Sequence, residues 1–302
     1  MTSQTLRKLF LDFMDYKGHA VIPSASILPK EDPTLLFVNS GMYPLVPYLM
    51  GQTHPLGSRI ADSQKCIRTL DIEEVGDNRH LSFFEMLGSW SLGDYSKDES
   101  IMWGFEFLTS EKWLNLNPQR LYVTVYKGSE FALPDTESIE SWQRAFRSVG
   151  IEPDVGIEFN FDKDDKTDKQ YIYRITQKSG KDNWWGLPYK GPCGPCSEIY
   201  YLQKRNPIDF RKNLFQKYNL QQIQEFLENE IVEIWNHVFM EYEGEWGENH
   251  EPRNLTPLKN RNVDTGMGFE RLLTVINDLE TVHQTDVLQP ISEIVKRWQD
   301  KQ

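Results

Sequence analysis

The stretch that decides the fold lies near the end of the chain, at Val263–Leu273, and reads VDTGMGFERLL. It sets an acid, two glycines and an arginine at the start of an apolar, helix-like run. Glycines let the backbone approach a ligand closely, and a helix N-terminus offers unpaired N–H groups to an anion. Taken alone, the stretch also fits an ordinary turn in which Asp264 caps a helix and Arg271 is a solvated charge. The rest of the chain must separate these interpretations.

The composition is that of a globular protein with one large domain or two smaller ones. Of its 302 residues, 39% are hydrophobic and 13% aromatic, so the chain can bury a substantial core. It contains no apolar run near the roughly 18 residues that span a membrane, and its first ten residues, MTSQTLRKLF, lack the apolar core of a signal peptide. We therefore expect a cytoplasmic protein without a membrane partner.

The charge has the wrong sign for a chain whose main task is to grip nucleic acid. Acids number 45 and bases 33, which gives a net charge of −12 and a pI of about 5.1; nucleic-acid binding favours a basic surface. A local basic patch is still compatible with that total. The densest charge run, DKDDKTDK at Asp162–Lys169, mixes both signs, and we interpret it as a solvated loop.

The three cysteines, Cys66, Cys193 and Cys196, are too few for a disulfide framework. Cys193 and Cys196 have the CxxC spacing of zinc or redox sites. A zinc site would need two further ligands, which Cys66 and the six histidines would have to supply. We therefore predict no metal bound by protein ligands alone.

Helical spacing of apolar residues predicts several amphipathic helices. One covers Leu6–Tyr16, with Thr2 or Ser3 available as its cap. Others are expected at Asp98–Leu108 and from about Leu214 to Glu230.

Runs of β-branched and aromatic residues predict strands at Thr34–Asn39 and Arg120–Tyr126. Period-two alternation predicts two more strands joined by a loop, each with one face defined by three residues: Gln64, Cys66 and Arg68, then Ser82, Phe84 and Met86. A further period-two run, VEIWNHVFMEY, carries one polar residue on an otherwise apolar face: Val232, Ile234, Asn236, Val238, Met240 and Tyr242. Strands interspersed with helices, without a regular βαβ rhythm, predict an α+β fold with an antiparallel sheet.

Six motifs in order resemble the catalytic domain of alanyl-tRNA synthetase: DPTLLFVNSGM, QKCIR, RHLSFFEMLGSWSLGDY, GPCGPCSEIYY, EIWNHVFM and VDTGMGFER. The last of them resembles motif 3 of the class II synthetases. The resemblance implies the class II aminoacyl-tRNA synthetase-like fold, an antiparallel sheet flanked by helices. It also implies an ATP-dependent ligase that converts ATP and an amino acid into aminoacyl-AMP and pyrophosphate with the help of Mg²⁺. For GPCGPCSE, it favours a structural role near the site over metal binding.

The resemblance implies roles for five residues that would hold ATP. In-line attack on the α-phosphorus builds charge on phosphate oxygens, so the site needs fixed cations and Mg²⁺ rather than a covalent nucleophile. Arg68 matches the motif 2 arginine, whose planar, permanently charged fork would hold the α-phosphate and the substrate carboxylate. Arg271 matches the motif 3 arginine, which would lie against adenine and reach the γ-phosphate. Phe84 would stack on the other adenine face, and Arg79 and His80 would lie near the phosphates.

A second set of matched residues would hold the amino acid. Asp264 would bind the substrate ammonium, because a carboxylate is the natural partner of a cation in a small pocket. The other positions that match residues around the amino acid are Met42, Trp185, Asn236, Val238 and Gly266. Met42, Trp185 and Val238 also fit a plain apolar core. We expect a small pocket that favours alanine, with glycine, serine and a non-standard amino acid left open.

The chain also departs from the family pattern. Arg68 is followed by the acidic TLDIEEVGDN, where the family carries a basic, Gly-rich stretch of the type AGGKHND. Tyr189 and Lys190 replace Asp-Thr, and Leu202 replaces an acid. Because the basic loop helps with ATP and the tRNA acceptor end, its loss puts transfer to tRNA in question more than it does activation.

The chain stops about thirty residues beyond motif 3, without the family's tRNA-recognition, editing and C-terminal oligomerisation domains. Truncation of a longer protein would also explain this absence, but it would not explain the altered loop in the middle of the chain. From the loop, the acidic charge and the absent domains together we expect a small relative, and from the absent oligomerisation domain a monomer, with an adenylation domain at 1–275 and a short helical extension at 276–302.

These observations leave three functional hypotheses. The chain activates alanine or a similarly small amino acid and transfers it to tRNA; or it is a stand-alone adenylating ligase that transfers the aminoacyl group to a carrier protein or small amine; or it is a non-catalytic, synthetase-like binding module. The presence of Arg68, Asp264 and Arg271 argues against the last.

Overall fold

A computed structural model of the chain describes residues 1–29, 35–158, 172–187, 190–213, 218–247 and 251–299. Within these residues one ten-stranded sheet runs in the order β1-β2-β3-β10-β9-β8-β4-β6-β5, and β7 pairs with β8. The strands are β1 Ala20–Val21, β2 Arg59–Ile67, β3 Phe83–Ser91, β4 Leu121–Tyr126, β5 Val155–Ile157, β6 Ile175–Lys178, β7 Trp184–Gly186, β8 Gly191–Leu202, β9 Ile231–Trp246 and β10 Pro252–Gly268.

The centre of the sheet, from β2 through β3, β10, β9 and β8 to β4, is antiparallel, as the sequence predicts. Its margins are parallel: β1 pairs with β2 in parallel, and so do β4 with β6 and β5 with β6. The sheet is therefore mixed, and the predicted α+β class is confirmed.

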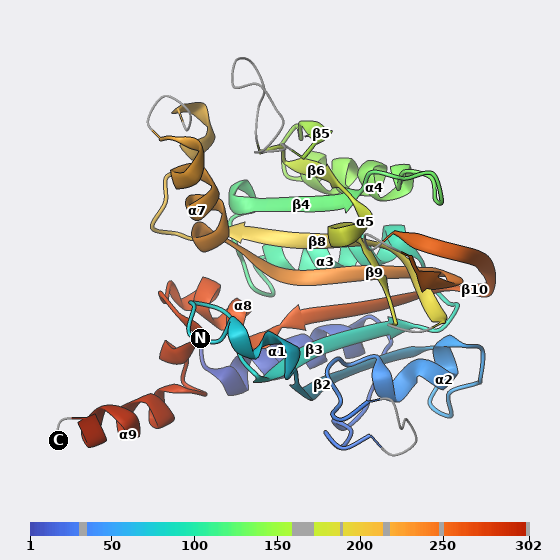
Figure 1. The fold of residues 1–302 in the computed structure, drawn as a ribbon, viewed down its shortest axis with the longest axis horizontal. Helices are drawn as coiled ribbons and strands as arrows, with labels where there is room; N and C mark the ends of the chain where they lie inside the picture. The colour runs from blue at the N-terminus through green and yellow to red at the C-terminus, as the bar shows by residue number, and fades with distance from the viewer. Residues whose placement is uncertain (30–34, 159–171, 188–189, 214–217, 248–250, 300–302) are drawn as a thin grey trace.

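Helices cover one face of this sheet. Figure 1 shows α1, α3 and α4 behind the strands. The helices are α1 Ser3–Tyr16, α2 Val46–Leu49, α3 Lys97–Thr109, α4 Thr136–Ser148, α5 Gly180–Asn183, α7 Leu220–Glu230, α8 Phe269–Asn277 and α9 Gln289–Gln299; short 3-10 turns lie at Tyr43–Leu45, Leu70–Glu73, Pro118–Arg120, Phe210–Asn213 and Val282–Gln284.

Aromatic rings form much of the core between helices and sheet. Phe10 of α1 meets Phe107 of α3 edge to face at 5.6 Å, and Phe105 of α3 meets Phe146 of α4 at 5.4 Å. Rings of this size supply large buried areas. The helix-covered face is thus the structural core, which leaves the opposite face of the central strands for a site.

The predicted helices are found with small changes at their ends. Thr2 caps α1, its hydroxyl accepting from the Thr5 amide, and α3 spans the predicted segment. Helix α7 begins only at Leu220, because Asn219 caps it: the Asn219 side chain accepts from the Gln222 amide at 2.9 Å. Residues 214–217 of the predicted helix lie outside the described residues, as does the charge run at 162–169.

The predicted strand at 34–39 is wrong over its described part. Residues 35–39 form bends rather than a strand. Val38 makes isolated backbone bonds, donating to the Ile27 carbonyl at 2.8 Å and accepting from the Ile67 amide at 2.9 Å. The β-branched Val38 of this segment is buried without being part of a strand in the sheet.

Strand β9 contains a bulge that the period-two prediction missed. On the β8–β9 ladder Ile199 faces Trp235, but the next residue, Tyr200, faces Glu233. Strand β9 therefore supplies one extra residue, Ile234, at this point. Such a bulge reverses which side chains point to which face.

The bulge corrects the predicted face of β9. Val232 and Ile234 pack into the helix-side core. Asn236 and Val238 point to the opposite face, and the bulge brings Glu233 to that face with them. The single apolar face predicted for this strand is therefore split between two sides of the sheet.

The C-terminal part consists of α8 and α9 with a short turn between them. Helix α8 ends at Asn277, two residues past the predicted domain boundary, and the extension as a separate unit stays a prediction. Helix α9 projects from the body at the lower left of Figure 1. Its apolar side chains are exposed: Ile291, Ile294, Val295 and Trp298. No helix in the described residues is long and apolar enough to cross a bilayer.

Candidate active site

A cavity of about 230 Å³ lies on the face of the sheet opposite the core. Its walls come from the β2–β3 loop, β3, β9, β10 and the first turn of α8. The predicted site residues that line it are Arg68, Arg79, His80, Phe84, Trp185, Asn236, Val238, Asp264, Gly266 and Arg271. Met42 is not among the lining residues; it is buried in an apolar cluster behind the wall, with Val238 and Trp185.

Strand register explains how residues far apart in sequence meet here. Asp264 of β10 lies between Trp90 of β3 and Val238 of β9, and Gly266 lies between Gly88 and Asn236. Because neighbours in register point to the same side of a sheet, these residues share one face.

Two paired glycines, Gly266 of the opening stretch and Gly88 of β3, make room at this point. A Cβ on Gly266 would come within 2.7 Å of the Met86 sulfur, and one on Gly88 within 2.0 Å of the Trp90 ring. Larger residues would fill the cavity floor or displace its walls. The glycines are therefore required by close packing beneath the cavity.

Asp264 is a buried acid on the cavity wall. Its side chain is 8% exposed, and burial raises its pKa to about 7. A second acid, Asp62 of β2, is buried nearby; burial and then the charge of Asp264 raise its pKa, and its Oδ1 has no hydrogen-bond partner in the described structure. Buried acids without a cation are destabilising in the charged form. A cationic group bound at Asp264 would relieve that cost.

Arg271 enters the cavity from the first turn of α8. Its Nη1 donates to Glu233 Oε2 at 2.9 Å. Behind Glu233 lies Glu198, which accepts from Thr124 at 3.1 Å and from the Tyr200 hydroxyl at 2.7 Å. Burial and then the charge of Glu233 raise the pKa of Glu198 to about 7.

Arg68 also has protein partners. Its Nε donates to the Asn39 carbonyl at 2.9 Å, and its guanidinium lies over the Phe84 ring, 5.2 Å from the ring centre. The ring that the resemblance assigns to a base is thus already a stacking surface for a planar cation.

The acids of the β2–β3 loop hold two of its own residues, Arg79 and His80. The backbone amides of Arg79 and His80 both donate to Asp77 Oδ1, at 2.9 and 2.7 Å. The His80 ring contacts Asp77 Oδ2 at 2.6 Å and Glu74 Oε2 at 3.0 Å. The loop that replaces the basic family stretch therefore positions Arg79 and His80 through its acids.

Several lining residues were not predicted from the sequence: Ser40, Asp71, Glu233 and Glu270. Glu233 was not predicted because simple alternation along β9 places its side chain on the helix-covered face. Only the bulge in β9 turns that side chain toward the cavity. Glu270 lies inside an apolar helical run, where a single acid resembles an ordinary first-turn residue. Its position directly before Arg271 was the sequence signal that could have identified Glu270 as a site residue.

The cysteines take no part in the cavity. Cys66, Cys193 and Cys196 are free and buried. Burial raises the pKa of Cys66 and Cys193 to about 12, so these thiols are poor nucleophiles. No cluster of three potential metal ligands occurs in the part of the chain that the structure describes.

A second cavity, of about 390 Å³, adjoins the first. Ser40, Arg68, Asp71 and Trp185 line both cavities. The rest of its wall is largely apolar and consists of Leu35, Leu36, Phe37, Asn39, Tyr43, Ile67 and Thr69. Arg68 therefore lies on the boundary between the two cavities.

Residues 5–302 match the sequence model of the family described as tRNA synthetases class II (A). The chain belongs to this family. Among curated relatives of this synthetase chain is the alanine–tRNA ligase of Treponema pallidum (strain Nichols), 41% identical over 291 residues, which are 95% of this chain and 42% of that protein. Another is the alanine–tRNA ligase of Borrelia hermsii (strain HS1 / DAH), 39% identical over 302 residues, which are 100% of this chain and 44% of the relative.

The synthetase chain thus spans less than half the length of these relatives. Among solved structures, the histidyl-tRNA synthetase of S. aureus aligns with a TM-score of 0.44 and 10% identity, covering 91% of this chain and 65% of the other.

Proposed function

We propose that the chain activates alanine with ATP to form alanyl-adenylate and pyrophosphate, and then transfers the alanyl group to tRNA. One observation carries this proposal: Arg68, at the end of β2, converges on one cavity with Asp264 and Arg271, which lie about 200 residues later on β10 and α8. A buried acid beside two guanidinium groups suits a substrate with an ammonium at one end that reacts with a polyphosphate.

The amino acid would bind at the Asp264 end of the cavity. The Asp264 carboxylate takes the ammonium, and the buried Asn236 Oδ1, which has no hydrogen-bond partner in the described structure, is free to accept from it too. Val238 and Trp185 form apolar walls there, with Met42 packed behind them. Such a wall leaves room for a methyl group, although apolar pockets discriminate weakly among substrates that differ by one small group.

In the activation step an oxygen of the substrate carboxylate attacks the α-phosphorus of ATP. The new bond joins that oxygen to phosphorus, the bond to the β-phosphate oxygen breaks, and pyrophosphate leaves with the electron pair. Arg68 would hold the α-phosphate and carboxylate in line. Arg271 would contact the base and the γ-phosphate, with Arg79 and His80 near the departing pyrophosphate. The three guanidinium groups would stabilise charge as it develops on phosphate oxygens, and the His80 ring could donate a hydrogen bond there.

The cavity also suits the Mg²⁺ that accompanies ATP. Mg²⁺ takes oxygen ligands and needs only one or two protein carboxylates, because phosphates and water complete its shell. Glu233 is a carboxylate on the wall beside Arg271 and would hold the ion. When bound, Mg²⁺ neutralises charge on the phosphate oxygens. Since Glu233 pairs with Arg271, that ion pair must open so that Arg271 can turn to the nucleotide.

In the second step a ribose hydroxyl of tRNA would attack the carbonyl carbon of the adenylate. The ester bond forms, the bond between the carbonyl carbon and the phosphate oxygen breaks, AMP leaves with the electron pair, and the proton of the hydroxyl passes to the phosphate of AMP. The adjoining cavity on the other side of Arg68 offers space for this acceptor, and the relatives are alanine–tRNA ligases. The acidic β2–β3 loop favours a second candidate, in which a carrier-protein thiol or small amine is the acceptor.

ATP–pyrophosphate exchange without tRNA tests the first step. We expect exchange with alanine to exceed exchange with glycine, serine and small non-standard analogues. Asp264→Ala should reduce it at least 100-fold, because the ammonium loses its partner. Asp15→Ala, at an exposed acid on α1, serves as the matched control. Full alanine-dependent exchange by Asp264→Ala would refute the assignment of the amino-acid site.

The acceptor is tested once exchange is established. Radiolabelled alanine should transfer to tRNA that carries an alanine anticodon, and not to carrier protein or small amines. Transfer to one of the latter alone would favour the second candidate.

A further inference from the structure

Glu270 is a buried acid on the cavity wall that the proposed reaction does not use. Its side chain is 4% exposed, it lies in the first turn of α8, and it precedes Arg271 directly. It lines the same cavity as Phe84 and Arg271. Burial raises the pKa of Glu270 to about 7, although hydrogen bonds from its own backbone amide and from the amide of Glu85 act to lower it. Because a buried charged carboxylate is destabilising unless it is paired, Glu270 is a candidate for contact with a polar group of a ligand.

The backbone of β3 fixes the Glu270 carboxylate beside Phe84. Met86 pairs with Gly268, the last residue of β10. One residue earlier, the Glu85 amide donates to the Glu270 side chain, at 3.1 Å to Oε1 and 3.3 Å to Oε2. Glu85 directly follows Phe84, so the carboxylate lies by the backbone of Phe84. A base stacked on that ring would present an edge to this carboxylate.

On the other side of the sheet the cation Arg7 is bound by Glu85, and it acts on Glu270 only through its charge, which counts against the rise in the Glu270 pKa. Glu85 points its own side chain toward α1, where Arg7 binds it through Nη2 at 2.7 Å and Nε at 2.8 Å. Ser63 also donates to that carboxylate at 2.8 Å. Among the described residues, no lysine or arginine forms an ion pair with Glu270. Its carboxylate therefore keeps acceptor capacity for a neutral donor in the cavity.

The edge of a purine tells adenine from its 6-oxo analogues. Adenine carries an exocyclic amine at position 6, which is a hydrogen-bond donor, whereas guanine and hypoxanthine carry an oxygen, which is an acceptor. A carboxylate accepts a hydrogen bond from the 6-amine of adenine. The 6-oxygen of guanine or hypoxanthine, placed opposite the same carboxylate, would find no hydrogen-bond donor. A site built to bond one such group rejects analogues that lack it more strongly than an apolar pocket can.

We propose that Glu270 selects ATP by accepting a hydrogen bond from the exocyclic amine of adenine stacked on Phe84. The inference rests on the proposed function in one respect, that the cavity binds a purine nucleotide. It goes further by assigning recognition of the base to a residue outside the phosphate-binding and amino-acid-binding sets.

The test compares ATP with inosine triphosphate, in which a carbonyl oxygen replaces the amine. In ATP–pyrophosphate exchange with alanine, we expect the wild type to prefer ATP at least 100-fold in kcat/KM. Glu270→Gln should reduce that preference at least tenfold, because an amide can donate to the oxygen as well as accept from the amine. The Gln side chain also keeps an oxygen for the Glu85 amide, which favours folding.

Glu233→Gln is the matched control, since it neutralises another acid on the same cavity wall. It should change kcat/KM for both nucleotides by the same factor. The inference is wrong if Glu270→Gln lowers both rates equally and leaves the preference intact, because Glu270 would then only support the backbone.

If the Glu270→Gln variant does not fold, a measurement on the wild type alone still tests the inference. Calorimetric affinities should fall in the order ATP, then the 6-unsubstituted purine riboside triphosphate, then inosine triphosphate. Equal affinities would overturn the inference. Discrimination in binding without any exchange activity would instead support the role of Glu270 and refute the proposed function.

Discussion

At the scale of single residues, burial of charge organises the site. Asp264, Glu270 and Glu198 all have pKa values raised to about 7, chiefly by burial. Carboxyls with raised pKa values cluster at functional sites because a fold tolerates their cost where a ligand repays it. Asp264 and Glu270 line one cavity, and Glu198 interacts with Glu233 of the same cavity wall.

We predict that KM for alanine rises as pH falls below about 7. The alanine ammonium stays protonated throughout, whereas Asp264, with its pKa raised to about 7, becomes neutral and loses its attraction for a cation. KM should then increase about tenfold per pH unit. Exchange rates at saturating ATP between pH 5.5 and 8.5 measure this. A flat KM over that range would contradict the role of Asp264.

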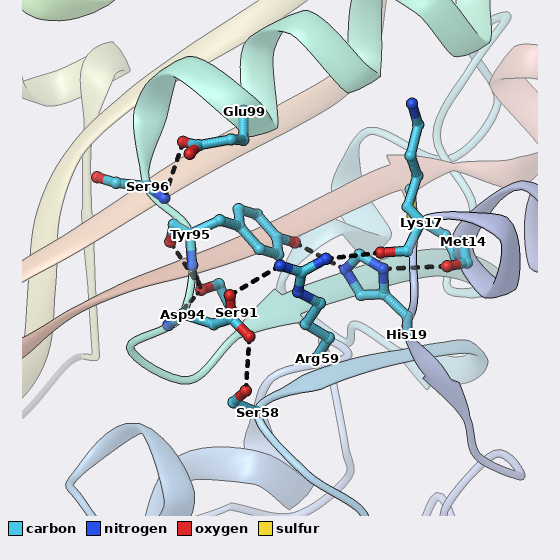
Figure 2. A network of polar contacts seen from close by, with 10 residues as sticks. All are labelled: Met14, Lys17, His19, Ser58, Arg59, Ser91, Asp94, Tyr95, Ser96 and Glu99. Atoms are coloured by element: carbon cyan, nitrogen blue, oxygen red, sulfur yellow. Dashed lines mark hydrogen bonds and ion pairs between the residues drawn. The ribbon is translucent and has the colours of Figure 1, made fainter.

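At the scale of elements, a polar network joins the end of α1 to the starts of β2 and α3 (Figure 2). Arg59 donates to the Lys17 carbonyl at 2.8 Å and to Asp94 Oδ1 at 2.9 Å. His19 Nε2 bonds the Tyr95 hydroxyl at 2.9 Å, and its Nδ1 contacts the Met14 carbonyl at 3.1 Å. The network fixes α1 against the strands that carry the cavity floor.

This network predicts a loss of stability in acid. Burial lowers the pKa of His19 to about 4, while the unfolded chain keeps a value near 6.5. As pH falls below 6.5 the unfolded state takes up the proton first, so the free energy of unfolding decreases until about pH 4. At pH 5 the loss from His19 amounts to about 2 kcal/mol.

Urea denaturation of the wild type and His19→Gln at pH 7.5 and 5.0 isolates this contribution. Other groups titrate equally in both proteins, so the wild type should lose about 2 kcal/mol more than the variant over this interval. Equal pH dependence in the two proteins would show that His19 is not the titrating group.

At the scale of the whole molecule, the cavity joins segments from the first third of the chain with segments near its end. Its walls come from β3, β9, β10 and α8, all of which pack on the single helix-side core. A ligand that contacts all of them therefore stabilises the entire cooperative unit, because it binds the folded state alone.

A non-hydrolysable alanyl-adenylate analogue should raise the midpoint of thermal unfolding. At one hundred times its Kd the stabilisation is about 2.7 kcal/mol, which corresponds to about 4 °C for a chain of this size. Asp264→Ala should show less than half of the shift at the same concentration. Equal shifts in the two proteins would place the analogue outside the cavity.

The sequence by itself determined the class of fold and most of the cavity. Helix periodicity located α1 and α3, and short motifs identified residues such as Arg68, Asp264 and Arg271 that the structure brings to one wall. Local patterns carry this information because apolar spacing decides which face of an element is buried.

Only the tertiary structure decided the remainder. The bulge in β9 turns Glu233 toward the cavity and Ile234 toward the core, which depends on pairing with β8 and not on alternation within β9. The position of Glu270 depends on the Glu85 amide, 185 residues away in sequence. Contacts between such distant segments follow from strand register, which local periodicity does not encode.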